Sequence, residues 1–533
     1  MRTKLVTAAL PALGLAGGTQ AQEKMLPTPA RVAGEGEGPY MRLVIRGAMM
    51  VEGDLTPPIG PVDIVIEGGK ITSILSAGTP GLPLKPNRPP SGATREIDAT
   101  GMMVLPGFVD THCHSGDPDK SPNPAYPYKL WLAHGVTTLR CVPLFGGDVA
   151  HALDDKRRAA AGEITAPDIY AYQTVGSGWD QGKVDNPEKA RAWVRWAAKQ
   201  GVDGIKLFNR GGDTPEIERA VIAEARKVGL GTVAHLSQPY SATFNARDAG
   251  EAGLGTVTHF YGHFESLLKD RRVADFPADY NFNDEQMRFG GVAGLWNQIV
   301  EPGGPEWRAY LAQQKANGVT FDPTMTIYSA SRDLMRAQKA DWQADYALPS
   351  LTQFFQSNRD NHGSYFFDWT TDDEVRWRNF YRVYMRLVND YKNIGGRVTT
   401  GSDSGFIYQL WGFGYVQEFE MLAEAGFAPL EVVQAATING ARTIYDPKGK
   451  APPFGLVRAG MEADLVIVPG NPLANWKLLR GTGTERLNPE TNRQERVGGV
   501  RWTISNGIVY DAPKLLADVR TMVTQAKASS RER

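Results

Sequence analysis

The stretch that most constrains the fold of this chain is residues 104–114, a short apolar run that ends in His112 and His114. On a β-strand, side chains at positions i and i+2 leave the same face about 6–7 Å apart, so two imidazoles placed this way can close on one cation. Cys113 would point to the opposite face. Taken alone, the motif is explained equally well by a strand that happens to contain two histidines, and the rest of the chain has to decide.

The centre of the chain alternates predicted strands and helices. Strands are expected at residues 104–114, 136–142, 169–172, 202–208, 231–235, 255–259, 318–325 and 397–403. Helix start signals lie between them, because Asn186-Pro187 and Thr214-Pro215 each place an N-cap residue before proline at the first helical position. Eight strands with helices between them predict a (β/α)8 TIM barrel, and a chain of 533 residues leaves room for an accessory domain.

Segments of β character flank this centre at both ends of the chain. Residues 41–46, 62–67 and 463–468 alternate apolar and polar side chains, and Asn506-Gly507 marks a hairpin turn. We therefore expect a small β-sandwich domain built from N- and C-terminal segments. The predicted boundaries are residues 40–106 and 451–512 for the two parts of the sandwich, 107–450 for the barrel and 513–533 for a C-terminal tail.

Two predicted connections are much longer than the others, at residues 260–304 and 327–370. Both follow barrel strands, so in a TIM barrel they lie on the catalytic face. They are rich in aromatic residues and methionine, and we expect a partly helical lid that sets the shape of a compact substrate. The sequence 371–374 (Thr-Asp-Asp-Glu) predicts a capping-box start for the helix that follows the second insertion.

The composition restricts the classes of partner. The net charge is −1, with Lys and Arg scattered along the chain, which argues against nucleic acid or an anionic membrane surface as the main partner. No segment reaches about 18 consecutive apolar residues, so no membrane span is predicted. A small-molecule substrate is expected, and the oligomeric state stays open between a monomer and a homo-oligomer.

The N-terminus has the features of a secretory signal peptide at residues 1–21. A charged start with Arg2 and Lys4 precedes an apolar core, and small residues at 19–21 offer a cleavage site. The expected location is therefore exported, either periplasmic or secreted. The two cysteines, Cys113 and Cys141, both lie in predicted barrel strands, which predicts two buried free thiols rather than a disulfide framework.

Several residues able to bind metal or transfer protons fall at the C-terminal ends of predicted barrel strands. They are His112, His114, Lys206, His235, His259 and Asp403. A single histidine at such a position is usually a hydrogen-bonded core residue. Because the C-terminal ends of barrel strands meet at one mouth, where active sites of this fold lie, the set together predicts a metal-dependent active site.

These motifs resemble the amidohydrolase superfamily, in particular its imidazolonepropionase-like and prolidase-like branch of metal-dependent hydrolases. The matching pieces are Pro106–His114, Gly204–Phe208, Ala234-His235, Thr258-His259, Thr400–Ser404 and the strand-like segment from Gly460. The likeness covers roughly residues 40 to 510. It is specific for the superfamily and weak for the substrate.

The resemblance implies a centre with two divalent metal ions, for which imidazole and carboxylate ligands favour Zn²⁺. One ion would be held by His112, His114 and Asp403. The second ion would be held by His235 and His259.

The resemblance also implies roles for the remaining groups of this centre. Lys206, carboxylated by CO₂ to a carbamate, would bridge the two ions together with a hydroxide. Asp403 would take the proton from the attacking hydroxide and pass it to the leaving nitrogen, as base and then as acid.

Three further residues are candidates for substrate contact. Arg210 could pair with a substrate carboxylate, although an ordinary surface arginine fits equally well. His263 could polarise the substrate or be a solvated loop histidine, and Tyr240 is a similar candidate.

The predicted function is a metal-dependent amidohydrolase, of prolidase or dipeptidase type, that cleaves an amide or peptide C–N bond in a dipeptide or an N-acyl amino acid. The same motifs are compatible with a mononuclear imidazolonepropionase-like enzyme that opens a cyclic amide with Lys206 unmodified. They also fit a lactone or ester hydrolase, and a non-catalytic binding protein could use the same scaffold.

Overall fold

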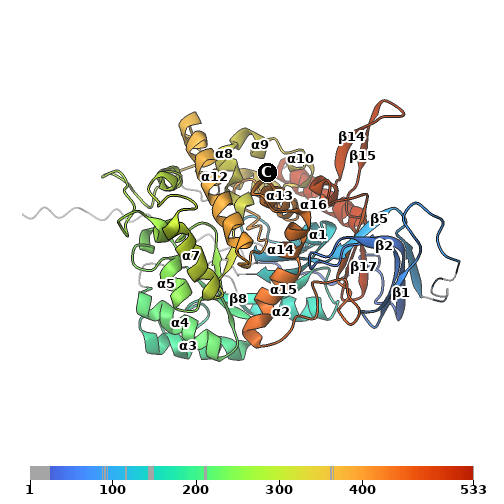
Figure 1. Cartoon of the computed structure of the whole chain (residues 1–533), viewed down its shortest axis with the longest axis horizontal. Coiled ribbons are helices and arrows are strands. Elements are labelled where there is room, and N and C mark those ends of the chain that lie inside the picture. The colour runs from blue at the N-terminus through green and yellow to red at the C-terminus, as the bar shows by residue number, and fades with distance from the viewer. Residues whose placement is uncertain are drawn as a thin grey trace, which may run out of the picture.

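A computed structural model describes residues 25–86, 88, 92, 94–114, 117–141, 149–208, 213–359, 363 and 365–531 of the chain. The predicted signal peptide and Arg210 lie outside these residues. Figure 1 shows two parts, a barrel surrounded by helices and, beside it, a β-sheet module in which blue and red strands meet.

The barrel is formed by parallel strands in sequence order. Within the described residues these are β6 (Phe108–Cys113), β7 (Val136–Cys141), β8 (Asp168–Thr174), β9 (Gly204–Leu207), β10 (Gly231–Ala234), β11 (Thr256–Thr258) and β12 (Thr320–Asp322). Each pairs only with its neighbours in the chain, so every connection crosses over in the same sense around the barrel.

The segment predicted as the eighth strand, 397–403, closes the ring between β12 and β6. Phe321 donates its N–H to the carbonyl of Arg397 at 2.9 Å, and on the other side Asp403 donates its N–H to the carbonyl of His112 at 2.8 Å. Only an isolated bridge, Phe321 to Val398, represents regular pairing. The segment therefore occupies the eighth strand position of the barrel without forming a regular strand. The predicted (β/α)8 barrel is confirmed.

Helices cover the outside of the barrel. The helices that follow β6 to β10 are α1 (Ala125–Ala133), α2 (Val149–Ala160), α3 (Pro187–Gln200), α4 (Pro215–Lys227) and α5 (Ala246–Glu251), and those that follow β12 or the closing segment are α12 (Thr371–Asn393), α13 (Phe413–Glu424), α14 (Pro429–Ala436) and α15 (Ile438–Tyr445). The two Asx/Thr-Pro signals are confirmed, because Asn186 and Thr214 accept N–H groups at the starts of α3 and α4. The predicted capping box is displaced by one residue: Thr370 and Asp373 form it instead of Thr371 and Glu374.

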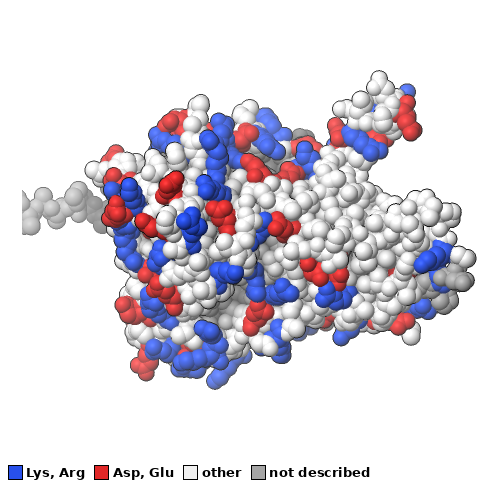
Figure 2. All heavy atoms as spheres, viewed as in Figure 1, with Lys and Arg blue, Asp and Glu red and all other residues white. Residues whose placement is uncertain are grey.

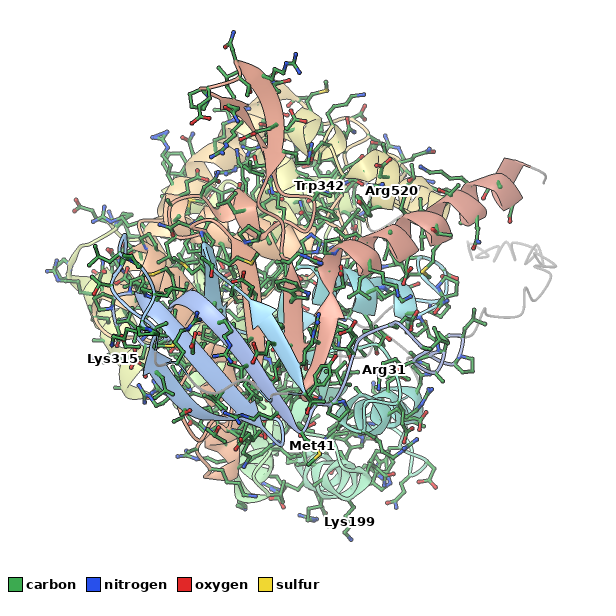
Figure 3. All side chains as sticks on the ribbon, turned by 90° about the vertical axis from the view of Figure 1, so that its right-hand side faces the viewer. Arg31, Met41, Lys199, Lys315, Trp342 and Arg520 are labelled. Atoms are coloured by element: carbon green, nitrogen blue, oxygen red, sulfur yellow. The ribbon has the colours of Figure 1, made fainter. Side chains whose placement is uncertain are left out.

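The β-sheet module is an eight-stranded sheet that combines both ends of the chain. Its strands are β1 (Arg42–Met50), β2 (Ile59–Glu67), β3 (Lys70–Ser76), β4 (Arg95–Asp98), β5 (Met102–Pro106), β13 (Leu465–Pro469), β16 (Trp502–Ser505) and β17 (Ile508–Asp511). Figure 3 shows the blue and red strands side by side in this sheet, where β5 pairs with β13. Asn506 and Gly507 have positive φ in the β16–β17 turn, which confirms the predicted hairpin.

Both long insertions contain short helices. The first contains α6 (Glu285–Val292), and the second contains α8 (Ser329–Arg332), α9 (Leu334–Gln338), α10 (Gln343–Tyr346) and α11 (Pro349–Phe354). The helix α7 (Pro305–Ala316) follows the first insertion and leads to β12. The C-terminal segment, expected as a tail, forms the helix α16 (Ala512–Arg531), because Leu515, Val519 and Val523 recur at intervals of four and are buried. A separate hairpin, β14 (Thr484–Asn488) with β15 (Arg493–Val497), projects from the body (Figure 1).

The surface does not concentrate one sign of charge. On the face in Figure 2, Lys and Arg alternate with Asp and Glu over the barrel helices, and the area over the β-sheet module is mostly uncharged. Among the described residues, no helix has both the length and the apolar character needed to cross a membrane.

Candidate metal centre at the barrel mouth

The six predicted site residues converge at the C-terminal end of the barrel. His112 lies in β6 and Lys206 in β9, whereas His114, His235 and His259 directly follow barrel strands and Asp403 is the last residue of the closing segment. All six line one cavity of about 750 Å³. The distribution follows from strand geometry, because residues at the ends of parallel strands face the same mouth.

The Asp403 carboxylate lies among three imidazoles. Its Oδ1 is 3.2 Å from Nε2 of His114 and 3.6 Å from Nε2 of His112, and its Oδ2 is 3.7 Å from Nε2 of His259. The ligand atoms of His112, His114 and Asp403 all lie within 4.8 Å of one another. His235 completes the group, with its ring centroid 4.8 Å from that of His259.

Threonine hydroxyls orient two of these imidazoles from behind. The hydroxyl of Thr258 lies 2.7 Å from Nδ1 of His112, and the hydroxyl of Thr324 lies 2.5 Å from Nδ1 of His259. When Nδ1–H donates to the hydroxyl, Nε2 carries the lone pair toward the cavity. Such outer contacts fix the tautomer and the ring orientation of metal-binding histidines.

Burial keeps these imidazoles neutral. It lowers the pKa of His112 and His235 well below the usual value and the pKa of His259 to about 3, and the charge of Lys206 acts in the same direction on all three. Neutral imidazole is the form that binds a metal ion.

Lys206 is the unusual member of the group. Its side chain is 1% exposed, and within the described residues its Nζ has no hydrogen-bond partner. Burial lowers the pKa of Lys206 to about 7, so a large fraction of the amine is neutral near physiological pH. A buried amine without a partner is costly unless something absent from the protein itself satisfies it.

The Asp403 carboxylate remains ionised. Burial by itself would raise the pKa of Asp403, but the neighbouring His114, His259 and Lys206 outweigh that effect and hold the pKa well below its usual range. The backbone of Asp403 has φ 48° and that of His259 φ 62°, a region rarely adopted by residues other than glycine. Backbone strain of this kind clusters at functional sites.

A buried ion pair under the mouth supports the first histidine strand. Asp322 accepts from Arg140 at 3.0 Å and from the hydroxyl of Thr111 at 3.1 Å, and its Oδ2 lies 3.8 Å from Nδ1 of His112. Gly401 allows the closing segment to approach, because a Cβ there would lie 2.6 Å from that of His112. The sequence patterns did not identify Asp322 or Arg140, although each is an ionisable residue in a barrel strand.

The other described residues predicted to contact the substrate, His263 and Tyr240, do not line the cavity. His263 is 1% exposed, binds the Tyr310 hydroxyl through Nδ1 at 2.6 Å and does not line the cavity, so it is neither solvated nor directed at a ligand. Tyr240 is half-buried at the end of the short helix η1 (Gln238–Tyr240) and also lies off the cavity wall. Cys113 and Cys141 are buried free thiols, as predicted.

Several cavity residues escaped sequence analysis. They come from loops and insertions: Lys120, Gln238, Tyr261, Arg288 and Phe406. Tyr328 and Phe354 also line the cavity, and they belong to the insertion at 327–370 that was expected to form a lid. The aromatic content of the insertions was a signal for some of them. No periodic pattern identifies Lys120 or Arg288, because neither belongs to a barrel strand.

The residues present fit a divalent metal centre. Four imidazoles and a carboxylate face one cavity, and imidazole nitrogen and carboxylate oxygen are ligands of Zn²⁺ and related ions. The unpartnered amine of Lys206 also fits, since a carbamate formed on it would supply anionic oxygens to cations.

Known proteins resemble the chain in both sequence and fold. Residues 382–509 match the Amidohydrolase family. The allantoinase of Rubrobacter xylanophilus is 28% identical over 229 residues, which are 41% of this chain and 45% of the relative. The dihydropyrimidinase of Rattus norvegicus is 27% identical over 176 residues, 32% of this chain and 31% of the relative. The chain thus matches less than half the length of these curated relatives.

Solved structures share the fold over most of the chain. A Xaa-Pro dipeptidase with bound methionine has a TM-score of 0.58 at 19% identity and covers 88% of this chain and 100% of its own. The bottromycin amidohydrolase has a TM-score of 0.60 at 19% identity and covers 92% of this chain and 91% of its own. The barrel with its histidine-lined mouth, the family match over residues 382–509 and the fold shared with these neighbours together support an assignment to the amidohydrolase superfamily.

Proposed function

We propose that the protein is a metal-dependent hydrolase that cleaves the amide or peptide C–N bond of a small substrate, a dipeptide or an N-acyl amino acid. The observation that carries this proposal is the buried amine of Lys206, which has no hydrogen-bond partner among the described residues and lies beside four histidines and Asp403 in one cavity. A purely structural core does not gain stability from an unpaired buried amine beside imidazoles and a carboxylate, whereas bound metal ions would be coordinated by these groups.

The proposed ligands divide into two sets. His112, His114 and Asp403 would hold one divalent ion, and His235 with His259 would hold a second. When bound, such ions polarise a carbonyl and lower the pKa of water toward neutrality.

Lys206 is proposed to join the two sets as a carbamate. Its neutral amine would attack the carbon of CO₂, form a C–N bond and release one proton, which leaves an anionic carboxylate on the side chain. The pKa of about 7 supports this step, because only the neutral amine is nucleophilic.

Asp403 is proposed as the residue that moves the proton. Its ionised Oδ1 and Oδ2 face the three imidazoles and the cavity, so it can accept a proton from water and deliver it to the leaving nitrogen. The lid insertions contribute Arg288, Tyr328 and Phe354 to the cavity wall, which restricts the substrate to a compact molecule.

The test is a hydrolysis screen with the purified, zinc-loaded protein. The panel contains dipeptides, N-acyl amino acids, lactones and esters, together with allantoin and a dihydropyrimidine because relatives carry the corresponding names. Turnover of dipeptides or N-acyl amino acids is expected. Turnover of only the cyclic amides or only the lactones would establish a different hydrolase, and no turnover at all would favour a binding protein.

Elemental analysis of the same sample separates one metal ion from two. Two ions per chain are expected, whereas one would favour the mononuclear enzyme with Lys206 unmodified. Export remains a proposal as well, and the N-terminus of protein recovered from the producing cells would test it, with cleavage near residue 21 expected.

A further inference from the structure

A second buried lysine faces the same cavity. Lys120 lies on the loop after β6 and is 5% exposed, and its Nζ is 3.5 Å from the ring centroid of Phe406 and 4.4 Å from that of Phe354. Its backbone is fixed by the turn from Asp117 and by Ser350, whose hydroxyl donates to its carbonyl at 2.7 Å. The ammonium therefore has a defined position in the wall.

The protein itself satisfies this ammonium only in part. Within the described residues, one carboxylate lies within ion-pair distance, that of Asp117, with Oδ2 at 3.4 Å from Nζ. Asp117 is held by its own turn, where its Oδ1 accepts the N–H of Asp119, and Asp119 is exposed. Since an ammonium has three N–H donors and aromatic faces accept none of them strongly, capacity for an anion remains.

The position of Lys120 relative to His114 and Asp403 indicates which part of a substrate it would contact. Phe406, which covers the ammonium, follows Asp403 by three residues and packs at 5.9 Å from the ring of His114. Asp403 is also one of the carboxylates whose charge acts on Lys120. The lysine thus lies against the ring that packs on His114 and follows Asp403 in the chain, and Arg288 lines the same cavity from α6.

We propose that Lys120 binds a carboxylate carried by the leaving amine of the substrate and thereby selects acyclic N-acyl or aminoacyl amino acids over neutral cyclic amides. This inference rests on the proposed hydrolysis, because Asp403 must lie beside the leaving nitrogen for its proton to reach it. A carboxylate on that side meets the ammonium between Phe354 and Phe406. A neutral cyclic amide would offer Lys120 no carboxylate beyond that of Asp117.

The experiment compares Lys120→Met with wild type in two measurements. The first is binding of the free amino acids leucine, phenylalanine and proline, each against its carboxamide, by calorimetry with zinc-loaded protein. Wild type is expected to bind the acids about ten- to hundredfold more tightly than the amides, and Lys120→Met to lose that difference. The second is the KM for a turned-over substrate, expected to rise by a similar factor with a smaller change in kcat.

Three control variants test whether the preference for a carboxylate depends specifically on Lys120. Lys120→Arg should retain part of the preference for the acid, Arg288→Met should retain it, and Lys199→Met, on the exposed face of α3 (Figure 3), should match wild type. Equal preference in Lys120→Met and wild type, loss of the preference in Arg288→Met instead, or no measurable binding of the panel would each overturn the proposal. A carboxylate preference that depends on Lys120 in a protein without hydrolytic activity would support the subsite and sink the hydrolase function alone.

Discussion

The β-sheet module and the barrel mouth each bury an ionisable side chain, Asp63 and Lys206, and the two differ in their hydrogen bonding. In the module, the Asp63 carboxylate receives two N–H groups of Arg88 at 2.6 and 2.8 Å and the N–H of Gly47 at 2.9 Å. At the mouth, Nζ of Lys206 is also buried and, within the described residues, has no hydrogen-bond partner. Lys206 is distinguished by the coincidence of a missing hydrogen-bond partner with a cavity lined by four histidines and a carboxylate, which indicates a ligand site.

The two regions also differ in backbone and packing. The module has its own hydrophobic core, built from alternating residues of paired strands such as Leu43, Ile45 and Leu465. The mouth places the buried residues His259, Thr324 and Asp403 in backbone conformations with positive φ, whereas in the module such non-glycine residues, Leu55 and Asn506, are exposed in connections between strands. The free energy that the module and the barrel core gain on folding stabilises a mouth that is itself not optimised for stability.

The largest expected effect is on turnover, from Asp403→Asn. The substitution removes the proposed proton shuttle but keeps the size of the side chain, so kcat should fall by about 10²–10⁴-fold while much of the metal stays bound. Steady-state kinetics together with elemental analysis measures both. Near-normal turnover in a metal-loaded variant would remove Asp403 from the mechanism. It would also weaken the distinction between a functional barrel mouth and a structural β-sheet module.

The next effect is on the metal, from Lys206→Ala. Loss of the proposed bridging carbamate should lower metal content and should reduce activity by more than the about 10–100-fold that follows removal of an outer contact. Acetate, propionate or another short carboxylate should restore part of the activity, because it can replace the missing anionic oxygens. Lys199→Ala serves as the control, and full metal content without rescue would favour an unmodified lysine.

A smaller effect is expected from Thr258→Val, which is close to isosteric and removes only the hydroxyl next to Nδ1 of His112. The affinity for zinc, measured by competition with a chelator, should fall about tenfold because the imidazole loses the contact that orients it. Stability should change little. An unchanged affinity would show that packing alone positions this ring.

The smallest effect on activity should come from the module, in Asp63→Asn. The variant should lose roughly 3 kcal/mol of unfolding free energy at neutral pH, because Arg88 and Arg46 lose their charged partner, while kcat stays within about twofold. Burial alone would raise the pKa of Asp63, but Arg88, the Gly47 N–H and Arg46 outweigh it and hold the pKa below its usual range.

The pH dependence of this effect has a defined sign. Because the folded-state pKa is lowered, the stabilisation is fully present above the unfolded value of about 4 and is lost as the pH falls through the folded value. Chemical denaturation of wild type and variant from pH 7 to pH 3 should therefore show the two curves converging on the acid side. A constant difference down to pH 3 would mean that the effect comes from packing instead.

Local patterns in the sequence were enough for the barrel and for the positions of the centre. Proline after an N-cap residue marked the starts of α3 and α4, and strand ends placed His112, Lys206 and Asp403 at one mouth. These patterns could not predict that the closing segment 397–403 forms no regular strand, because its pairing depends on both neighbouring strands, β12 and β6. The C-terminal helix α16 was also missed, although its apolar residues recur every four positions.

The amino-acid sequence by itself determined which strands, turns and strand-end side chains this protein has, because periodicity and capping are local and act over a few residues. Tertiary structure alone decided which side chains from the insertions and loops face the centre, among them Lys120, Arg288 and Phe354. It also brought Asp322, Arg140 and Thr111 together from three strands far apart in the chain. Contacts of this kind depend on long loops closing around a packed core, and no short-range pattern encodes them.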